Sequence, residues 1–305
     1  MRVLVLGGSG FIGSHLVDAL LDQGKSVRVF DRSPERYRPL PSGVDFIQGN
    51  FEDSTLLAEA LTDVDQVFHM ISTTIPATSN LDPVSDVQGN LINTIRLLEL
   101  MRAESVRRLI YLSSGGMVYG IPQSNFLREN HQLKPITSYG IVKVAIENYL
   151  HMEKHLYGLE PVILRASNPY GSRQGHSGAQ GVIGTFMWKL VNGEPIQIWG
   201  DGSIVRDFIY VRDLARLCVI SADSEITGCY NAGSGIGHSI AEIVDAIQEV
   251  TGKNITPIIK PGRLIDVPHV VLDISAITDA TSWYPKVNLS DGLKETWEWV
   301  QTQKI

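Results

Sequence analysis

Tyr139 and Lys143 are the side chains of this sequence whose types and spacing most directly indicate acid–base chemistry. In the segment Tyr139-Gly-Ile-Val-Lys143 they lie four residues apart, which places them one turn apart on one face of a helix. A phenol is a poor base at neutral pH because its reference pKa is about 10. A neighbouring ammonium favours the phenolate. The pair therefore predicts a proton-transfer site, and the structural alternative is a surface tyrosine packed on a lysine stem.

A glycine-rich segment, Gly7-Gly8-Ser9-Gly10-Phe11-Ile12-Gly13, follows an apolar run at residues 3–6 and opens an amphipathic run at residues 11–21. Strand, glycine turn and helix form the context of a dinucleotide-binding segment. The glycines let the backbone approach a pyrophosphate, and the helix N-terminus offers amide donors. The alternative is a tight strand-to-helix turn that binds no ligand. The residues expected to hold a dinucleotide are Gly7, Gly10, Phe11, Ile12 and Gly13.

Asp31 lies at the end of a second predicted strand, about 20 residues after the glycines, where a dinucleotide-binding unit places an acidic residue. A carboxylate there accepts hydrogen bonds from the adenosine ribose and repels a 2′-phosphate. This favours NAD over NADP as the cofactor. Arg32 adjoins it and leaves a contact to a 2′-phosphate open, and the structural alternative for Asp31 is a solvated loop carboxylate.

The first half of the chain alternates β-type runs with helical patterns, which predicts βαβ units and a parallel sheet covered on both faces. The predicted strands are Arg2–Leu6, Ser26–Phe30, Val44–Gln48, Gln66–Ile71, Arg108–Ser113 and Val162–Arg165. The predicted helices are Phe11–Asp22, Ser54–Leu61, Val84–Ala103 and Thr137–Tyr157. We therefore expect an α/β fold in which a doubly wound parallel sheet (Rossmann) forms a dinucleotide-binding domain over residues 1–166.

Residues 167–305 are expected to form a smaller, mixed α/β substrate-binding region, with residues of about 203–235 packing back onto the first domain. The Gly-, Ser- and Asn-rich stretch Ser167–Gln180 predicts a long functional loop. Pro195–Trp199 and Val205–Tyr210 are interpreted as two strands around a turn at Asp201-Gly202. Three later helices are predicted at residues 181–191, 240–250 and 291–301, with Ser290 as the N-cap of the last.

The composition narrows the class of protein. A chain of 305 residues with a formal charge of −7 argues against nucleic acid as a partner. Two cysteines, Cys218 and Cys229, make neither a disulfide framework nor a metal-ligand cluster, so we expect no metal and a cytoplasmic location. No apolar run approaches the roughly 18 residues of a membrane span, and no secretory leader is recognisable, so no membrane partner is expected.

Further motifs occur in a fixed order along the chain. They are Gln48-Gly-Asn-Phe-Glu-Asp53, Val67-Phe-His-Met-Ile-Ser72, Asn90, Ser113-Ser-Gly-Gly-Met-Val-Tyr-Gly120, Leu164-Arg-Ala-Ser-Asn-Pro-Tyr-Gly171, Gly200-Asp-Gly202, Val205-Arg-Asp-Phe-Ile-Tyr-Val211 and Arg263-x-x-Asp266. Together with the glycine segment and the Tyr–Lys pair, they resemble the extended short-chain dehydrogenase/reductase family. The resemblance covers nearly the whole chain and is greatest to nucleotide-sugar epimerases and dehydratases of the UDP-glucose 4-epimerase type.

The resemblance implies roles for individual residues. It gives Tyr139 the acid/base role and makes Lys143 its partner, and both also contact the cofactor. The other residues that it places near the cofactor are Asn50, Phe51, Met70, Ile71, Ser72, Asn90 and Ser113. The residues that it places at the substrate are Asn168, Val182, Arg206, Arg263 and Asp266. Planar arginine donors suit the oxygens of a diphosphate.

One position departs from the family pattern. Gly115 stands where the family usually has the Ser or Thr that hydrogen-bonds the reacting hydroxyl and the tyrosine. Three explanations stay open: Ser114 reaches the site as a catalytic hydroxyl, Tyr139 acts with water alone, or activity is reduced. Dehydrating members generally carry acidic residues after this position, whereas Gly116 and Met117 follow here. This favours 4-epimerisation.

The resemblance therefore implies an NAD-dependent 4-epimerase of a nucleoside-diphosphate sugar, with a UDP-hexose as the expected substrate and a 4-keto sugar as the transient intermediate. The alternatives are a sugar-nucleotide dehydratase or reductase, and a non-catalytic member that binds the sugar nucleotide. Val270, by spacing, is expected to control room for an N-acetyl group, and Arg173 and His176 are expected near the sugar. A homodimer through residues 84–103 and 137–157 is implied, and His69 is interpreted as a buried structural histidine.

Overall fold

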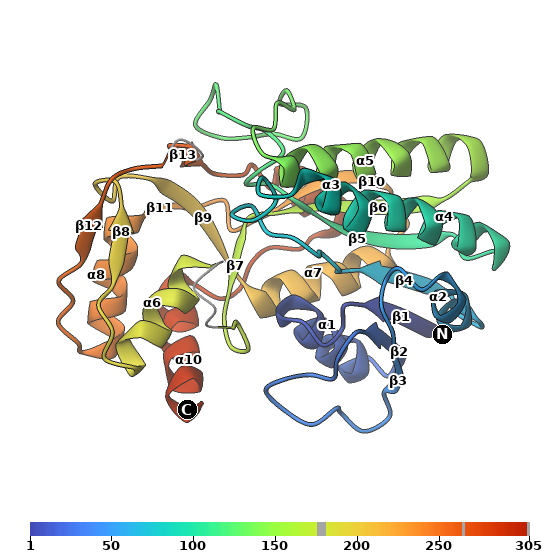
Figure 1. Cartoon of the computed structure of the whole chain (residues 1–305), viewed down its shortest axis with the longest axis horizontal. Coiled ribbons are helices and arrows are strands. Elements are labelled where there is room, and N and C mark those ends of the chain that lie inside the picture. Colours follow the sequence, from blue (N-terminus) through green and yellow to red (C-terminus); the bar gives the residue numbers. More distant parts are fainter. Residues whose placement is uncertain (176–180, 264–265, 304–305) are drawn as a thin grey trace.

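Seven parallel strands form the main sheet in the order β10-β6-β5-β4-β1-β2-β3, as the computed structural model shows for a chain described at residues 1–175, 181–263 and 266–303 (Figure 1). The order β3-β2-β1-β4-β5-β6 is that of a doubly wound dinucleotide-binding fold, so the predicted fold class is confirmed. The strands of this sheet are β1 (Arg2–Leu6), β2 (Ser26–Asp31), β3 (Asp45–Gln48), β4 (Gln66–His69), β5 (Arg108–Ser114), β6 (Glu160–Ala166) and β10 (Gly228–Ala232).

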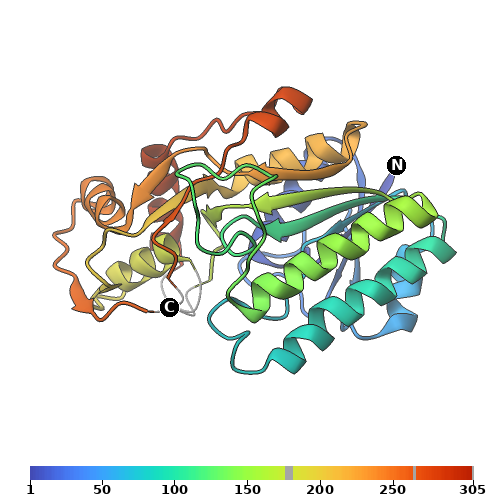
Figure 2. The same ribbon diagram turned by 90° about the horizontal axis from the view of Figure 1, so that it is seen from above.

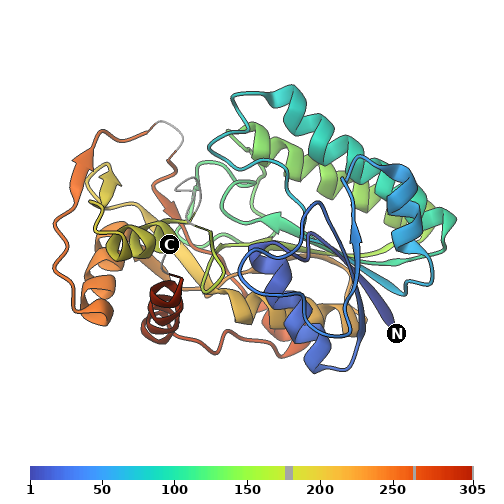
Figure 3. The ribbon, with the colours of Figure 1, turned by 60° about the horizontal axis from the view of Figure 1, so that its bottom comes forward.

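Helices cover both faces of the sheet, because its central strands are apolar on both sides. One face carries α1 (Phe11–Asp22) and α7 (Val211–Asp223), which pack against each other (Figure 3). The other face carries α2 (Ser54–Leu61), α4 (Asn93–Ala103) and α5 (Ser138–Tyr157). Figure 2 shows α4 and α5 side by side over this face. Val3 and Leu4, neighbours on β1, are both fully buried, one in each core.

Local signals fix where the helices begin and end. Thr137 caps α5 by accepting a hydrogen bond from the Gly140 amide at 3.2 Å, and α5 ends at Gly158 with a φ of +72°. α4 follows without a break from α3 (Pro83–Asp86) and a π-helical turn, η1 (Val87–Ile92). The single helix predicted over Val84–Ala103 is therefore continuous in the structure but locally wider.

The C-terminal part forms a second, smaller layer beside the main sheet (Figure 1). Strand β9 lies at its centre and pairs with β7, β11 and β13. The strands of this part are β7 (Asn168–Tyr170), β8 (Gln197–Trp199), β9 (Val205–Tyr210), β11 (Gly237–Ser239), β12 (Ile258–Lys260) and β13 (His269–Val270). Its helices are α6 (Val182–Val191), α8 (Ile240–Thr251) and α10 (Leu289–Thr302), whereas α9 (Ser275–Thr281) packs against β10 of the main sheet.

The expected pairing of β8 with β9 around Asp201-Gly202 is wrong. Strand β8 pairs in parallel with β12, whereas β9 belongs to the other small sheet. Gly200 and Gly202 have φ values of +80° and +85°, and the carboxylate of Asp201 accepts from the Ser203 amide at 2.9 Å. This turn therefore directs the chain from one small sheet into the other instead of back along itself.

Two smaller expectations are also corrected. Helix α10 begins two residues earlier than predicted, and Asn288, not Ser290, caps it by accepting from the Asp291 amide at 2.9 Å. The stretch predicted as a loop at Ser167–Gln180 contains the short strand β7, and its residues 176–180, with His176, lie outside the described residues. Over the described ranges, no helix has the length and apolar character that a membrane crossing requires.

Candidate active site

A cavity of about 460 Å³ lies at the carboxyl ends of β1, β4, β5 and β6, where open α/β sheets bind their ligands. It gathers predicted site residues from separate parts of the sequence. Those that line it are Gly7, Gly10, Phe11, Ile12, Gly13, Met70, Ser72, Ser113, Ser114, Tyr139, Lys143, Asn168 and Arg206. The glycine turn and the Tyr–Lys pair lie far apart in the sequence, and the structure brings them to the same cavity.

The glycine turn at one wall of this cavity has no room for side chains. Gly7 has a φ of +82°, and a Cβ on Gly13 would lie 2.1 Å from the carbonyl oxygen of Gly7. Helix α1 starts at Phe11, and its N-cap residue, Gly10, has no side chain to cap it. Its first amides therefore stay available to an anion, and the positive end of the helix dipole reinforces their attraction for a pyrophosphate.

Asp31 closes the end of β2 beside this turn. Its carboxylate accepts from the Ser9 amide at 3.0 Å, and burial raises its pKa. Ser9 Oγ is buried, and no hydrogen-bond partner for it occurs among the described residues. Ser167 lines the cavity of about 460 Å³, called the larger cavity below, and its buried hydroxyl also has no hydrogen-bond partner among the described residues. A bound dinucleotide would supply partners for such groups, so the residues present fit NAD.

Lys143 is buried beneath the cavity. Its ammonium donates to the Leu112 carbonyl at 2.9 Å and lies 5.6 Å from the centre of the Tyr139 ring. Burial lowers the pKa of Lys143 to about 8 and raises that of Tyr139 to about 12. A positive charge brought into the cavity would favour the Tyr139 phenolate, so the pair fits a proton transfer beside a charged nicotinamide ring.

The backbone at Tyr139 is fixed from the segment after β4. The Tyr139 amide donates to Ser79 Oγ at 3.1 Å, and the Ser138 amide donates to the Asn80 side chain at 2.8 Å. Ser138 Oγ donates to Asp86, a fully buried carboxylate, at 2.6 Å. These contacts hold the first turn of α5, and with it Tyr139, against the cavity.

The two serines at the end of β5 differ in role. Ser113 Oγ donates to Glu147 at 2.5 Å, and Glu147 forms a buried ion pair with Arg165 at 2.7 Å. Ser114 lines the larger cavity. Hence the side chain of Ser113 is engaged in the protein interior, although the residue itself borders the cavity.

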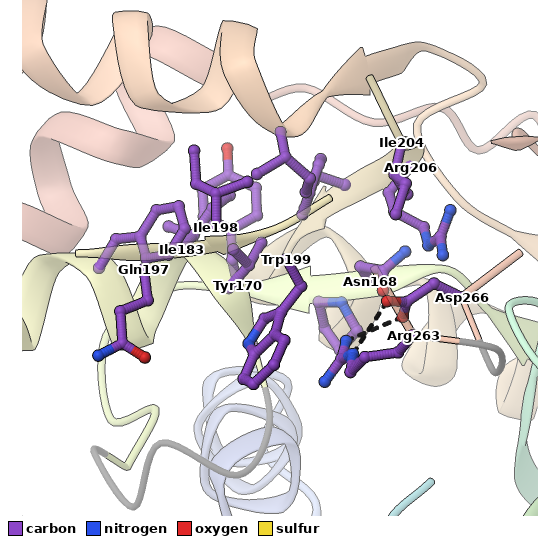
Figure 4. A pocket seen from close by; sticks show the side chains of 16 residues that line it. Asn168, Tyr170, Ile183, Gln197, Ile198, Trp199, Ile204, Arg206, Arg263 and Asp266 are labelled. Atoms are coloured by element: carbon purple, nitrogen blue, oxygen red, sulfur yellow. Dashed lines mark hydrogen bonds and ion pairs between the residues drawn. The ribbon is translucent and has the colours of Figure 1, made fainter. Parts of the chain in front are cut away.

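A second cavity of about 190 Å³ adjoins the first and shares Asn168 and Arg206 with it. Figure 4 shows Asn168, Arg206, Arg263 and Asp266 together at one end. Arg263 forms a two-pronged ion pair with Asp266, at 2.9 and 2.8 Å. Burial and the nearby Arg263 charge lower the pKa of Arg206 to about 10. Two guanidinium groups face one carboxylate here, and the excess positive charge suits a bound diphosphate.

The amide of Asn168 is oriented by the neighbouring strand. Its Nδ2 donates to the Asp207 carbonyl at 2.9 Å, which leaves its side-chain oxygen available to the cavities. Val182, the first residue of α6, lines the smaller cavity as well. All five predicted substrate residues therefore border this smaller cavity.

Several other predicted cofactor residues are not among the lining of the larger cavity. Ile71 packs against Gly7, and Asn90 accepts from the Thr73 amide at 2.8 Å, holding the loop after β4. Asn50 and Arg32 are exposed, whereas Phe51 is buried in the core.

Two expectations about the sugar are corrected by the structure. Val270 is 1% exposed in a core cluster with Leu272 and lines neither cavity. Arg173 is turned toward Asp18 of α1, at 2.5 Å, and toward Glu35 at 3.7 Å. Both side chains are engaged in packing or ion pairs, because the loops around them fold against neighbouring elements that the spacing does not reveal.

Sequence reasoning missed the aromatic wall of the smaller cavity. Trp199, at the end of β8, is 43% exposed and lies 5.4 Å from the Arg263 guanidinium (Figure 4). Tyr170 and Phe186 also line this cavity. The sequence carries no signal for this wall, because the exposure of Trp199 depends on how β8 and the neighbouring segments fold together.

His69 is 2% exposed, and its Nε2 lies 3.0 Å from Thr94 Oγ1. Burial lowers its pKa to about 3, so the ring stays neutral. The prediction of a structural histidine is confirmed.

Comparison with known proteins places this geometry in a family. Residues 3–233 match the model of the NAD-dependent epimerase/dehydratase family. The chain is 34% identical to a UDP-glucose 4-epimerase of Mycolicibacterium smegmatis, over 99% of each chain. It superposes on the UDP-glucose 4-epimerase of Thermotoga maritima with UDP-glucose at a TM-score of 0.95 and 34% identity, covering 99% of both chains.

The UDP-glucose 4-epimerase of Thermus thermophilus in complex with NAD gives a TM-score of 0.91 at 34% identity, covering 98% of this chain and 99% of that one. The family model spans the glycine turn and the Tyr–Lys pair, and these relatives extend the match over the C-terminal part. This chain therefore belongs to the NAD-dependent epimerase/dehydratase family.

Proposed function

We propose that this enzyme is an NAD-dependent 4-epimerase whose substrate is a UDP-hexose. The observation that carries the proposal is the junction of the two cavities. Asn168 and Arg206 border both, so a molecule whose diphosphate lies at Arg206 and Arg263 extends its sugar toward Tyr139. The relatives named as UDP-glucose 4-epimerases support the choice of substrate.

Residues 1–166, completed by α7 and β10, hold the cofactor in this proposal, and the later residues hold the sugar nucleotide. NAD, when bound, would supply a reversible hydride acceptor for C4 of the sugar. Gly7, Gly10 and Gly13 would hold its diphosphate, and Asp31 would accept hydrogen bonds from its adenosine ribose. Lys143 would stabilise the Tyr139 phenolate.

Tyr139 moves the proton. As the phenolate, it removes the proton of the C4 hydroxyl while C4 is oxidised, which leaves a 4-keto sugar. The ketone then turns about its diphosphate linkage, and Tyr139 returns the proton to the oxygen after C4 is reduced from the other face.

The turn after β5 favours epimerisation over dehydration. A dehydratase needs a base for the C5 proton and an acid for the leaving water. Gly116 and Met117 line the larger cavity at this turn and offer neither. A keto sugar formed here is therefore reduced again and loses no water.

We further propose a cytoplasmic homodimer that pairs through α3, η1, α4 and α5. Exposed apolar side chains on these helices support it. Val84 is 65% exposed, and Ile141 and Leu156 on one face of α5 are 56% and 57% exposed. Such an apolar surface is typical of an interface between subunits.

Proton NMR of the purified protein with UDP-glucose, UDP-N-acetylglucosamine, UDP-glucuronate and UDP-xylose tests the function. A C4 epimer that forms to equilibrium without net NADH supports it and identifies the sugar. A keto or deoxy product would replace it with a dehydratase or reductase. Binding of NAD and UDP-sugar without turnover would indicate the non-catalytic alternative that Gly115 raises.

A further inference from the structure

The turn after β5 leaves no space for a side chain at position 115. A Cβ added there would lie 2.5 Å from Leu272 Cδ1 and 3.0 Å from the Arg165 carbonyl oxygen. The Gly115 amide also donates to the Ala166 carbonyl at 2.7 Å, which ties the turn to β6. This backbone is therefore packed for glycine, and a hydroxyl partner for Tyr139 has to come from elsewhere.

Ser72, at the turn after β4, is a second source of a hydroxyl. It lines the larger cavity, as Tyr139 does, and its hydroxyl lowers the pKa of Tyr139. Ser113, in contrast, donates to the buried Glu147 at 2.5 Å. Among the described serines that line this cavity, Ser72 is the one that lowers the pKa of Tyr139.

The turn that carries Ser72 is tied to the helix that carries Tyr139. Ser72 Oγ donates to the Thr74 carbonyl at 2.9 Å, and Thr74 Oγ1 donates to Asp86 at 2.6 Å. The other oxygen of Asp86 accepts from Ser138 Oγ at 2.6 Å, next to Tyr139. These bonds connect the turn of Ser72, an exposed residue at the rim of the cavity, to the first turn of α5 through a buried carboxylate.

We propose that Ser72 is a catalytic residue of this enzyme, whose hydroxyl takes the place of the missing side chain at position 115. This inference rests on the proposed epimerase function. Ser72 Oγ–H turns from the Thr74 carbonyl to the oxygen of Tyr139 and donates a hydrogen bond to the phenolate. The same oxygen accepts a hydrogen bond from the C4 hydroxyl before its proton passes to Tyr139. Ser72 keeps its own proton throughout, so only Tyr139 changes its protonation state.

The charged and titratable groups around Tyr139 come from three elements. Lys143 and Glu147 lie on α5, Asp86 ends α3, and Tyr111 lies on β5. The Asp86 carboxylate raises the pKa of Tyr139, whereas the hydrogen bond from Ser72 lowers it. Removal of the Ser72 hydroxyl should therefore raise the pKa of Tyr139, so that Tyr139 ionises at higher pH.

The test compares Ser72→Ala with Ser72→Thr and Ser124→Ala in the NAD-loaded enzyme. Ser124 is a matched control: it is exposed like Ser72 and its hydroxyl also donates to the carbonyl two residues on, at 2.8 Å, but it lines neither cavity. A positioned proton-transfer partner is worth about 10²–10⁴-fold in rate, so kcat of Ser72→Ala is expected to fall at least about 100-fold. KM for the UDP-sugar and the content of bound NAD should stay within a few-fold.

Two further readouts separate catalysis from folding. The acid limb of the kcat/KM profile should move to higher pH in Ser72→Ala, and Ser72→Thr should restore most of the rate. Two outcomes would overturn the role of Ser72. One is a wild-type kcat with an unchanged pH profile in Ser72→Ala. The other is a loss of kcat of this size in a Ser114→Ala variant while Ser72→Ala keeps its rate. Failure of the wild type to epimerise any UDP-sugar would instead overturn the proposed function.

Discussion

Leu272 fills the space that a side chain at Gly115 would occupy. Its Cδ1 lies 2.5 Å and its Cδ2 3.0 Å from the point where a Cβ would stand, and Leu272 itself is fully buried. Residue 272 comes from the segment after β13, which also forms an isolated bridge with Leu127. Leu272, from the last quarter of the chain, therefore restricts position 115 to glycine.

Gly115→Ala is expected to lower the free energy of unfolding by about 1–3 kcal/mol, the usual cost of overpacking a core. Gly116→Ala is the matched control because no atom lies within 4 Å of its Cβ position. It should change stability by less than about 0.5 kcal/mol. Urea unfolding of both variants measures the difference, and equal stabilities would contradict the packing argument.

Tyr139→Phe should reduce kcat by about 10²–10⁴-fold, since it removes the group that transfers the proton. The ring remains, so binding of UDP-sugar, measured by calorimetry, should change little. Tyr157→Phe is a suitable control because this tyrosine is 52% exposed at the end of α5. Full turnover in Tyr139→Phe would refute its assigned role.

Asp86→Asn should move the acid limb of the kcat/KM profile to lower pH. The carboxylate raises the pKa of Tyr139, so a neutral amide of the same shape makes the phenolate easier to form. Asp82→Asn, an exposed residue that caps the same short helix, should leave the profile in place. A profile of Asp86→Asn that coincides with wild type, or moves to higher pH, would show that this charge does not act on Tyr139.

Arg206→Gln should raise KM for the UDP-sugar by about 10- to 100-fold, because a hydrogen bond to a charged group is worth about 1.5–3 kcal/mol. The effect on kcat should be smaller, since the diphosphate is remote from the reacting carbon. Arg128→Gln serves as the control: its ion pair with Asp273 involves a side chain that is 73% exposed. Equal KM values for the two variants would remove Arg206 from the diphosphate site.

His15 should make the protein less stable in acid. Burial lowers its pKa to about 4, and its Nε2 donates to the Ser172 carbonyl at 2.9 Å. The neutral ring is therefore stabilising above its unfolded pKa of about 6.5. This stability is lost between about pH 6.5 and 4, at up to about 1.4 kcal/mol per pH unit.

His15→Gln should flatten this part of the dependence of unfolding free energy on pH, which denaturant titrations at several pH values measure. His151→Gln, on an exposed position of α5, should keep the wild-type slope. An unaltered slope in His15→Gln would assign the acid sensitivity to other groups.

Much of the fold follows from local signals in the sequence. Arg2–Leu6, Phe11–Asp22 and Ser54–Leu61 are predicted with the bounds that the structure has, because an apolar run or an amphipathic period is decided by nearby residues. The pairing of β8 is not local. It depends on β12, some sixty residues later, so a turn motif alone gives the wrong partner.

The candidate site likewise has features that the sequence predicts and features that depend on contacts between distant segments. Residues of the glycine turn and the Tyr–Lys pair come together because parallel strands end at one edge of the sheet. The exposed Trp199, the buried Val270 and the ion pairs of Arg173 depend on how separate loops fold together. Side-chain burial of that kind has no signal in residue spacing.

The late strand β10 has a consequence for how the molecule is made. It pairs with β6 from Gly228 to Ala232, and α7 before it packs on α1. A growing chain on the ribosome therefore holds an open β6 edge and a bare apolar face of α1 until residue 232 has emerged. Any shortened form built to retain cofactor binding has to include this strand, and a break at residue 166 would release a fragment prone to aggregate.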